Sequence, residues 1–157
     1  MGESEAAWAD LHHCLDTTLN VVANEVKYKA DVVKQYGPLP EVECVASQLN
    51  QVFMTLVVNA AQAIAEHGTI TTGTEGEGVF VAVRDTGAGI PPEVKKRIFD
   101  PFYTTKPVGT GTGLGLSVSY SIVERHGGRI TVDSKVGEGT EFKIWLSTRY
   151  PAAKASA

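Results

Sequence analysis

Two glycine-containing motifs hold residues that could do chemistry together. In the first, Asp85-Thr86-Gly87-Ala88-Gly89-Ile90, a carboxylate that can accept hydrogens from an adenine amino group stands beside glycines that let a flat ring approach the backbone. The second, Gly111-Thr112-Gly113-Leu114-Gly115-Leu116, precedes an expected helix, whose N–H groups and positive end favour phosphate. With Asn59 on an upstream helix, the two motifs in this order predict a nucleotide site.

Each of these residues also has a plainer interpretation. Asp85 could serve only its own tight turn, the second glycine cluster could be a hinge, and Asn59 could make a buried structural hydrogen bond. The Asn59 amide oxygen could instead hold Mg²⁺, which prefers oxygen ligands. Lys106 could meet a phosphate or stay solvated. The glycine cluster is not a Walker loop, because no lysine follows its last glycine.

The spacing of apolar residues predicts the helices that must position these motifs. Apolar side chains recur every three or four residues in three stretches, as they do on one face of a helix. Ser47 is the expected N-cap of the second helix and Gly68 its end. Long helices are expected over 7–27, 48–66 and 113–126, and a short one over about 91–99.

Alternating patterns and turn residues predict the strands. The last four are expected to form two hairpins. This order predicts an α/β (α+β) two-layer sandwich, with a mixed, mostly antiparallel sheet covered on one face by about three helices. Residues 100–112 show no periodicity and are expected to form a mobile loop. Strands are expected over 31–36, 42–45, 69–74, 79–84, 129–134 and 140–147.

Composition and charge exclude several classes of function. With 157 residues, 43% hydrophobic and 20% charged, the chain has the composition of one globular domain. A net charge of −4 without a basic block argues against nucleic acid as a partner. The longest apolar run, Val52 to Ala61, is too short to span a bilayer, and no signal peptide is expected. Cys14 and Cys44 are expected to be small core residues in a reducing compartment.

The motifs resemble those of the catalytic ATP-binding (HATPase, Bergerat-fold) domain of bacterial two-component sensor histidine kinases. That family shares its superfamily with DNA gyrase B, the MutL mismatch-repair proteins and a heat-shock chaperone. The matching segments cover about residues 9–147. Residues 51–63 resemble the asparagine box, 85–89 the first glycine box, 98–102 the phenylalanine box, 111–116 the second glycine box, and 137–140 the last glycine motif.

The resemblance implies a role for each motif. Asn59 would hold Mg²⁺, Asp85 would bind the adenine amino group, and Thr140 would support adenine beside it. Residues 100–112 would be the ATP lid. No catalytic residue is implied beyond the ATP site itself. The implied ATP-binding residues are Asn59, Asp85, Gly87, Gly89, Ile90, Phe99, Phe102, Lys106, Gly111, Thr112, Gly113, Leu114, Gly115, Leu116 and Thr140.

By the same resemblance, the chain supplies the γ-phosphoryl group of Mg-ATP to a histidine on a separate dimerisation domain of the same receptor. A response-regulator aspartate would receive it next. The box that carries the accepting histidine is absent, since His12 and His13 are not followed by the required acid and proline. The fragment, expected to be monomeric and cytoplasmic, would bind ATP without phosphorylating itself. His67 and His126 are expected at helix C-terminal ends, where a positive charge is favoured.

Residues 9–149 are expected to form the ATP-binding domain. Residues 1–8 would be a leader, either part of the first helix or an added segment. Residues 150–157 would be a disordered tail.

Two other functions compete with this interpretation. A free-standing anti-sigma serine kinase fits the length, but such kinases carry Glu four residues before the asparagine, where this chain has Thr55. One helical turn would put that carboxylate on the face of the metal ligand, where it could activate a hydroxyl as Thr cannot. Sensor kinases often carry Asn at this position, so Thr55 leaves a minor Mg²⁺ or phosphate contact open. The second alternative is a non-catalytic nucleotide-sensing module.

Overall fold

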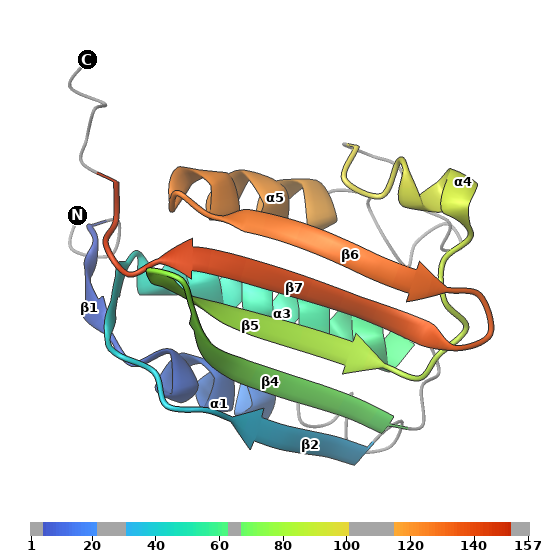
Figure 1. Cartoon of the computed structure of the whole chain (residues 1–157), viewed down its shortest axis with the longest axis horizontal. Coiled ribbons are helices and arrows are strands. Elements are labelled where there is room, and N and C mark those ends of the chain that lie inside the picture. The colour runs from blue at the N-terminus through green and yellow to red at the C-terminus, as the bar shows by residue number, and fades with distance from the viewer. Residues whose placement is uncertain (1–4, 22–30, 63–66, 101–114, 152–157) are drawn as a thin grey trace.

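A computed structural model of the chain describes residues 5–21, 31–62, 67–100 and 115–151. One layer is a five-stranded sheet, and the helices lie on one of its faces (Figure 1). The elements in chain order are β1 (Ala7–Ala9), α1 (Leu11–Val21), β2 (Asp31–Tyr36), β3 (Val42–Cys44), α3 (Ala46–Gln62), β4 (His67–Glu75), β5 (Gly78–Asp85), α4 (Pro92–Lys95), α5 (Gly115–Arg125), β6 (Arg129–Lys135) and β7 (Gly139–Ser147).

The sheet is mixed and mostly antiparallel, as the sequence predicts. Its strand order is β2-β4-β5-β7-β6, and only the β2–β4 pair is parallel. The last strand of the chain, β7, therefore lies between β5 and β6. A separate two-stranded sheet joins β1 to β3 at one end of the molecule (Figure 1).

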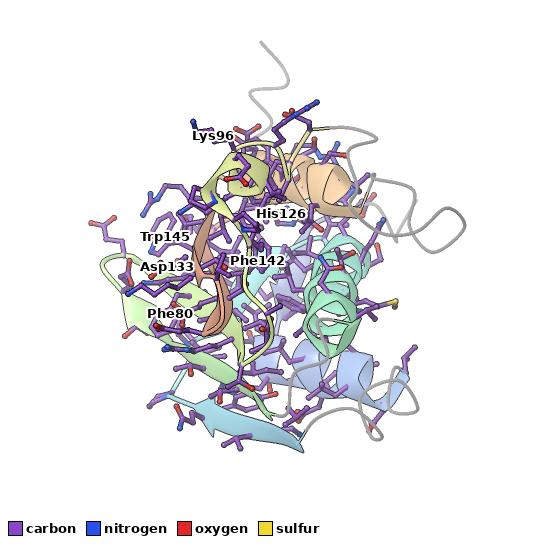
Figure 2. The ribbon with its side chains drawn as sticks, turned by 90° about the vertical axis from the view of Figure 1, so that its right-hand side faces the viewer. Phe80, Lys96, His126, Asp133, Phe142 and Trp145 are labelled. Atoms are coloured by element: carbon purple, nitrogen blue, oxygen red, sulfur yellow. The ribbon has the colours of Figure 1, made fainter. Side chains whose placement is uncertain are left out.

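Helix α3 forms the centre of the core. Leu49, Val52, Phe53 and Leu56 recur at helical spacing and are all fully buried against the sheet and the neighbouring helices α1 and α5. On β7, the residues that face them alternate with residues on the other face of the sheet. In Figure 2, which views one end of the sandwich, Phe142 lies between the layers and Trp145 on the outer face of the sheet.

The prediction of a helix from residue 7 is wrong, because β1 occupies Ala7–Ala9 and pairs with β3. Asp10 then begins α1: its carboxylate accepts the backbone N–H of His12 at 2.9 Å, and its carbonyl accepts that of Cys14 at 3.2 Å. Pairing with β3 overrides the helical apolar spacing of the first residues, and the N-cap Asp10 marks where the helix starts.

The start of α3 also differs from the prediction. The helix begins at Ala46, so Ser47 lies within its first turn and is not the N-cap. The carbonyl of Val45 accepts the backbone N–H groups of Gln48 and Leu49 at 3.0 and 3.1 Å. Gly68 does not end this helix either, because it pairs within β4.

The predicted strands and the third long helix agree with the structure in kind and in position. The predicted strands correspond to β2 to β7, and the third long helix to α5. The short helix is limited to α4, after which two backbone turns continue to Asp100. The predicted lid and the terminal residues 152–157 lie outside the described residues.

Both cysteines are buried in the core, as expected from the sequence. Burial raises the pKa of the Cys44 thiol to about 12 and also raises the pKa of Cys14, so both are neutral thiols. Within the part of the chain that the structure describes, no helix is both long and apolar enough to cross a membrane.

Candidate nucleotide site

Asp85 is the last residue of β5 and is only 6% exposed. Its Oδ1 atom accepts the backbone N–H of Gly87 at 2.8 Å, and the carboxylate also accepts the backbone N–H of Thr140. Burial raises the pKa of Asp85, and these two N–H donors oppose the shift. Two donors leave acceptor capacity on the carboxylate for a ligand hydrogen.

Three polar residues form a row across the sheet at this end. Asp85 pairs with Thr140 on β7, and Thr140 pairs with Ser134 on β6. Residues directly opposite one another in antiparallel strands share a face, so these three side chains lie side by side. The Oγ atoms of Ser134 and Thr140 are 2.8 Å apart.

The loop after Asp85 is clamped by the β6–β7 hairpin. The backbone N–H of Ile90 donates to Ser134 Oγ at 2.7 Å, and the backbone N–H of Gly137 donates to the carbonyl of Ala88 at 2.7 Å. Gly89 has a φ of +80°, and a Cβ there would collide with the carbonyl oxygen of Lys135. This position therefore requires glycine.

The start of α5 lies at the same end of the molecule. There β5 and α3 end and β7 begins, on the right-hand side of Figure 1. Gly115 opens α5 so close to α3 that a Cβ on it would lie 3.3 Å from the methyl group of Thr55. Asn59 lies one helical turn beyond Thr55 on α3 and is half-buried. A helix N-terminus thus stands beside the face of α3 that carries Thr55 and Asn59.

Phe99 fixes the chain just before the predicted lid. Its ring packs 5.4 Å from Tyr120 on α5 and 6.4 Å from Phe142 on β7, measured between ring centroids. Ile90 and Leu116 are also partly buried against the core. Phe99 is therefore anchored between α5 and the sheet.

Several predicted site residues have no described position. The structure brings together Asn59, Asp85, Gly87, Gly89, Ile90, Phe99, Gly115, Leu116 and Thr140 at one end of the sandwich. Outside the described residues lie Phe102, Lys106, Gly111, Thr112, Gly113 and Leu114.

Ser134 lies in this polar row and is not among the residues predicted from the sequence. The signal was available: Ser134 and Thr140 stand three residues before and after Gly137, the centre of the predicted hairpin, so they must pair. Among the described residues no group of three or more His, Cys, Asp or Glu side chains could hold a metal.

Two histidines have structural contacts. The ring of His12 stacks on Tyr36 with 4.3 Å between centroids, and its Nε2 lies 2.7 Å from Thr72 Oγ1. His126 does not carry the positive charge predicted for a helix end. It is buried, and burial lowers its pKa, which keeps the ring neutral. His67 begins β4 and does not end a helix.

The buried carboxylate of Asp85 thus lies at the end of the sandwich where α5 begins. The family model for histidine kinase-, DNA gyrase B- and HSP90-like ATPases matches residues 44–150. The chain belongs to this family, whose members are ATP-binding domains.

The curated relatives are sensor kinases. Sensor histidine kinase ZraS of Escherichia coli (strain K12) is 39% identical over 141 residues, which make up 87% of this chain and 30% of that protein. Sensor kinase CckA of Brucella abortus is 41% identical over 143 residues, 80% of this chain and 15% of that protein. The chain thus spans less than a third of the length of these relatives.

Solved structures of histidine kinases also resemble this chain. The catalytic domain of histidine kinase ThkA, in a nucleotide-free form, superposes with a TM-score of 0.82 at 30% identity over 92% of this chain and 97% of that one. Full-length ShkA in complex with AMPPNP superposes with a TM-score of 0.81 at 26% identity, over 90% of this chain and 31% of that one. The fold is that of a histidine kinase catalytic domain.

Proposed function

We propose that this chain is the catalytic domain of a sensor histidine kinase, which binds Mg-ATP and supplies its γ-phosphoryl group to a histidine on a separate dimerisation domain. A response-regulator aspartate is the proposed final acceptor. The observation that carries the proposal is the buried Asp85 carboxylate, held by two backbone N–H groups at the end of the sandwich where α5 begins.

In this proposal, one end of the site binds adenine and the other end binds the phosphates. Asp85 accepts a hydrogen from the adenine amino group, and Thr140 supports the ring beside it. The glycine cluster that ends at Gly115 cradles the phosphates, with the positive end of α5 behind it. Lys106 and the rest of the lid, assigned from sequence, close over the phosphates. Catalysis then rests on positioning and on neutralising charge.

The residues at the phosphate end fit Mg²⁺. Asn59 offers an amide oxygen, a hard ligand that this ion accepts, and phosphate oxygens and water complete its shell in such sites. When bound, the ion supplies charge neutralisation at the phosphates.

Position 55 disfavours the serine-kinase alternative. Thr55 faces the N-terminus of α5, so a general base at this position would stand at the phosphate end. A threonine hydroxyl cannot take a proton from serine near neutral pH, whereas a neutral imidazole is nucleophilic without such help. Histidine is therefore the favoured acceptor.

Calorimetric titration with ATP, with and without Mg²⁺, tests the nucleotide site first. Saturable binding to one site is expected, and no binding up to millimolar ATP would contradict the proposal. The acceptor is tested with labelled Mg-ATP and the histidine-bearing segment supplied in trans. Acid-labile phosphate is expected on that segment and none on this chain, while acid-stable phosphoserine on a partner would support the alternative.

A further inference from the structure

The contacts of Ser134 determine which way the hydroxyl of Thr140 points. Ser134 Oγ makes three hydrogen-bond contacts: with the backbone N–H of Ile90 at 2.7 Å, the carbonyl of Gly139 at 3.0 Å and Thr140 Oγ1 at 2.8 Å. A hydroxyl has one proton to donate and two lone pairs that accept. Three partners therefore use its full capacity.

Only one arrangement of protons satisfies all three contacts. The N–H of Ile90 can only donate and the carbonyl of Gly139 can only accept, so Ser134 gives its proton to Gly139. The remaining contact is a hydrogen bond only if Thr140 donates its own proton to Ser134. The Thr140 oxygen is then left with lone pairs alone.

This arrangement places two acceptors next to each other on one face of the sheet. Asp85 pairs with Thr140 across β5 and β7, and both residues are 6% exposed. The carboxylate accepts hydrogen bonds, and Thr140 Oγ1 can also only accept once its proton points to Ser134. A ligand that meets this pair must bring hydrogen-bond donors, because an acceptor would leave both groups unpaired in a buried place.

We propose that Ser134 is a specificity-determining residue, which fixes Thr140 Oγ1 as an acceptor and so selects purines with an amino group at C6 over those with a carbonyl there. This inference rests on the proposed nucleotide site and names the chemistry that the site selects. Ser134 acts through Thr140, so it is a positioning residue for the adenine end. Because Ser134 also accepts the backbone N–H of Ile90, the orientation of the Thr140 hydroxyl depends on the position of the loop after Asp85.

Replacing the hydroxyl tests the proposal. In Ser134→Ala, Thr140 loses its acceptor, so its hydroxyl can turn and donate to a C6 carbonyl. The measured quantity is the ratio of the dissociation constants of ITP and ATP, which carry a carbonyl and an amino group at C6. We expect this ratio to fall by about three- to tenfold, the range for one uncharged hydrogen bond. A loss of affinity for both nucleotides by the same factor would overturn the proposal, because a merely structural role predicts it.

Two further variants sharpen the test. Thr131→Val removes a hydroxyl from the exposed face of the same strand and is expected to keep the wild-type ratio. In a Thr140→Val background, Ser134→Ala is expected to change the ratio no further; a second drop would mean that Ser134 does not act through Thr140 and would overturn the proposal. If Ser134→Ala does not fold, judged by circular dichroism, Ser134→Val, which also lacks an acceptor for the Thr140 proton, replaces it with the same expected outcomes.

Nucleotide binding by the wild-type chain distinguishes a failure of this inference from a failure of the proposed function. If it binds neither ATP nor ITP, the nucleotide site itself has failed. If it binds ATP and the ratio survives Ser134→Ala, only the role of Ser134 has failed.

Discussion

The Nε2 atom of His126 accepts the backbone N–H of Val45 at 3.1 Å, which joins the end of α5 to the start of α3. The other ring nitrogen, Nδ1, donates to the carbonyl of Ile122 at 2.8 Å, so both nitrogens are used by a neutral ring. The edge-on ring of Tyr150 lies 4.9 Å from it. One side chain thus joins α3 to α5, the two helices at the proposed phosphate end of the site.

We expect the free energy of unfolding to decrease as the pH is lowered, because of this histidine. Because burial lowers the pKa of His126 in the folded state below the ordinary value of 6.5, the unfolded chain binds the proton more readily. Its contribution is present above pH 6.5 and is lost as the pH falls below that value. His126→Gln should cost about 1 to 3 kcal/mol at pH 7.5 and flatten the dependence between pH 7.5 and 5.5, measured by urea unfolding.

The control for this change is His13→Gln, at an exposed position of α1. The free energy of unfolding of this variant should depend on pH in the same way as that of the wild type. An equally steep dependence in His126→Gln and in wild type would show that another group carries the effect.

At Asp85, we expect opposite effects on stability and binding. Burial raises the pKa of this carboxyl, so its charged form costs stability once the pH rises through the folded pKa. Asp85→Asn should therefore raise the melting temperature of the free chain at pH 7.5. It should weaken ATP binding about 10- to 150-fold, the loss of a hydrogen bond of about 1.5–3 kcal/mol to a charged group. Calorimetric and thermal titrations measure both, and unchanged affinity would remove Asp85 from the adenine site.

The two glycines of the clamp form a matched pair. Gly89 and Gly137 have φ angles of +80° and +85°, but a Cβ on Gly89 meets the backbone of Lys135, while one on Gly137 meets nothing within 4 Å. Gly137→Ala should cost about 1 kcal/mol for the backbone conformation alone. Gly89→Ala should cost more than about 3 kcal/mol and also weaken ATP binding, because the loop after Asp85 must shift. Equal unfolding free energies in the two variants would contradict the close packing of Gly89 against the β6–β7 hairpin.

Removing the proposed metal ligand should matter only when the metal is present. Asn59→Ala should weaken ATP binding about tenfold in Mg²⁺ and leave binding in EDTA nearly unchanged. Gln51→Ala, on the exposed side of the same helix, is the control. The same loss in Mg²⁺ and in EDTA would mean that Asn59 contacts the nucleotide or the fold and not the ion.

Much of the fold follows from periodicity. The apolar faces of α3 and α5 and the alternation along β7 predict which residues are buried, because burial of those faces is what stabilises the elements. The first strand could not be predicted in this way. Ala7–Ala9 is a strand only because Val42–Cys44 lies beside it, and such long-range pairing has no local signature.

The sequence predicts only some of the residues that meet at the proposed adenine end of the site. Asp85 and the glycines carry a local signal, whereas Ser134 depends on register across a hairpin and on the loop that returns to it. His126 was misjudged for a similar reason. Its position at the end of a helix suggests a cation, but its burial, which arises from distant segments around Val45 and Tyr150, keeps it neutral.

The central place of β7 bears on how the protein is made. Because β7 is the last strand of the chain yet lies between β5 and β6, a nascent chain that has not released residues 139–147 from the ribosome has β5 as an open sheet edge. Asp85 at that stage lacks its neighbour Thr140. The proposed nucleotide site therefore gains the neighbour of Asp85 only after β7 has been made, and until then the exposed edge of β5 is a surface for chaperones to cover.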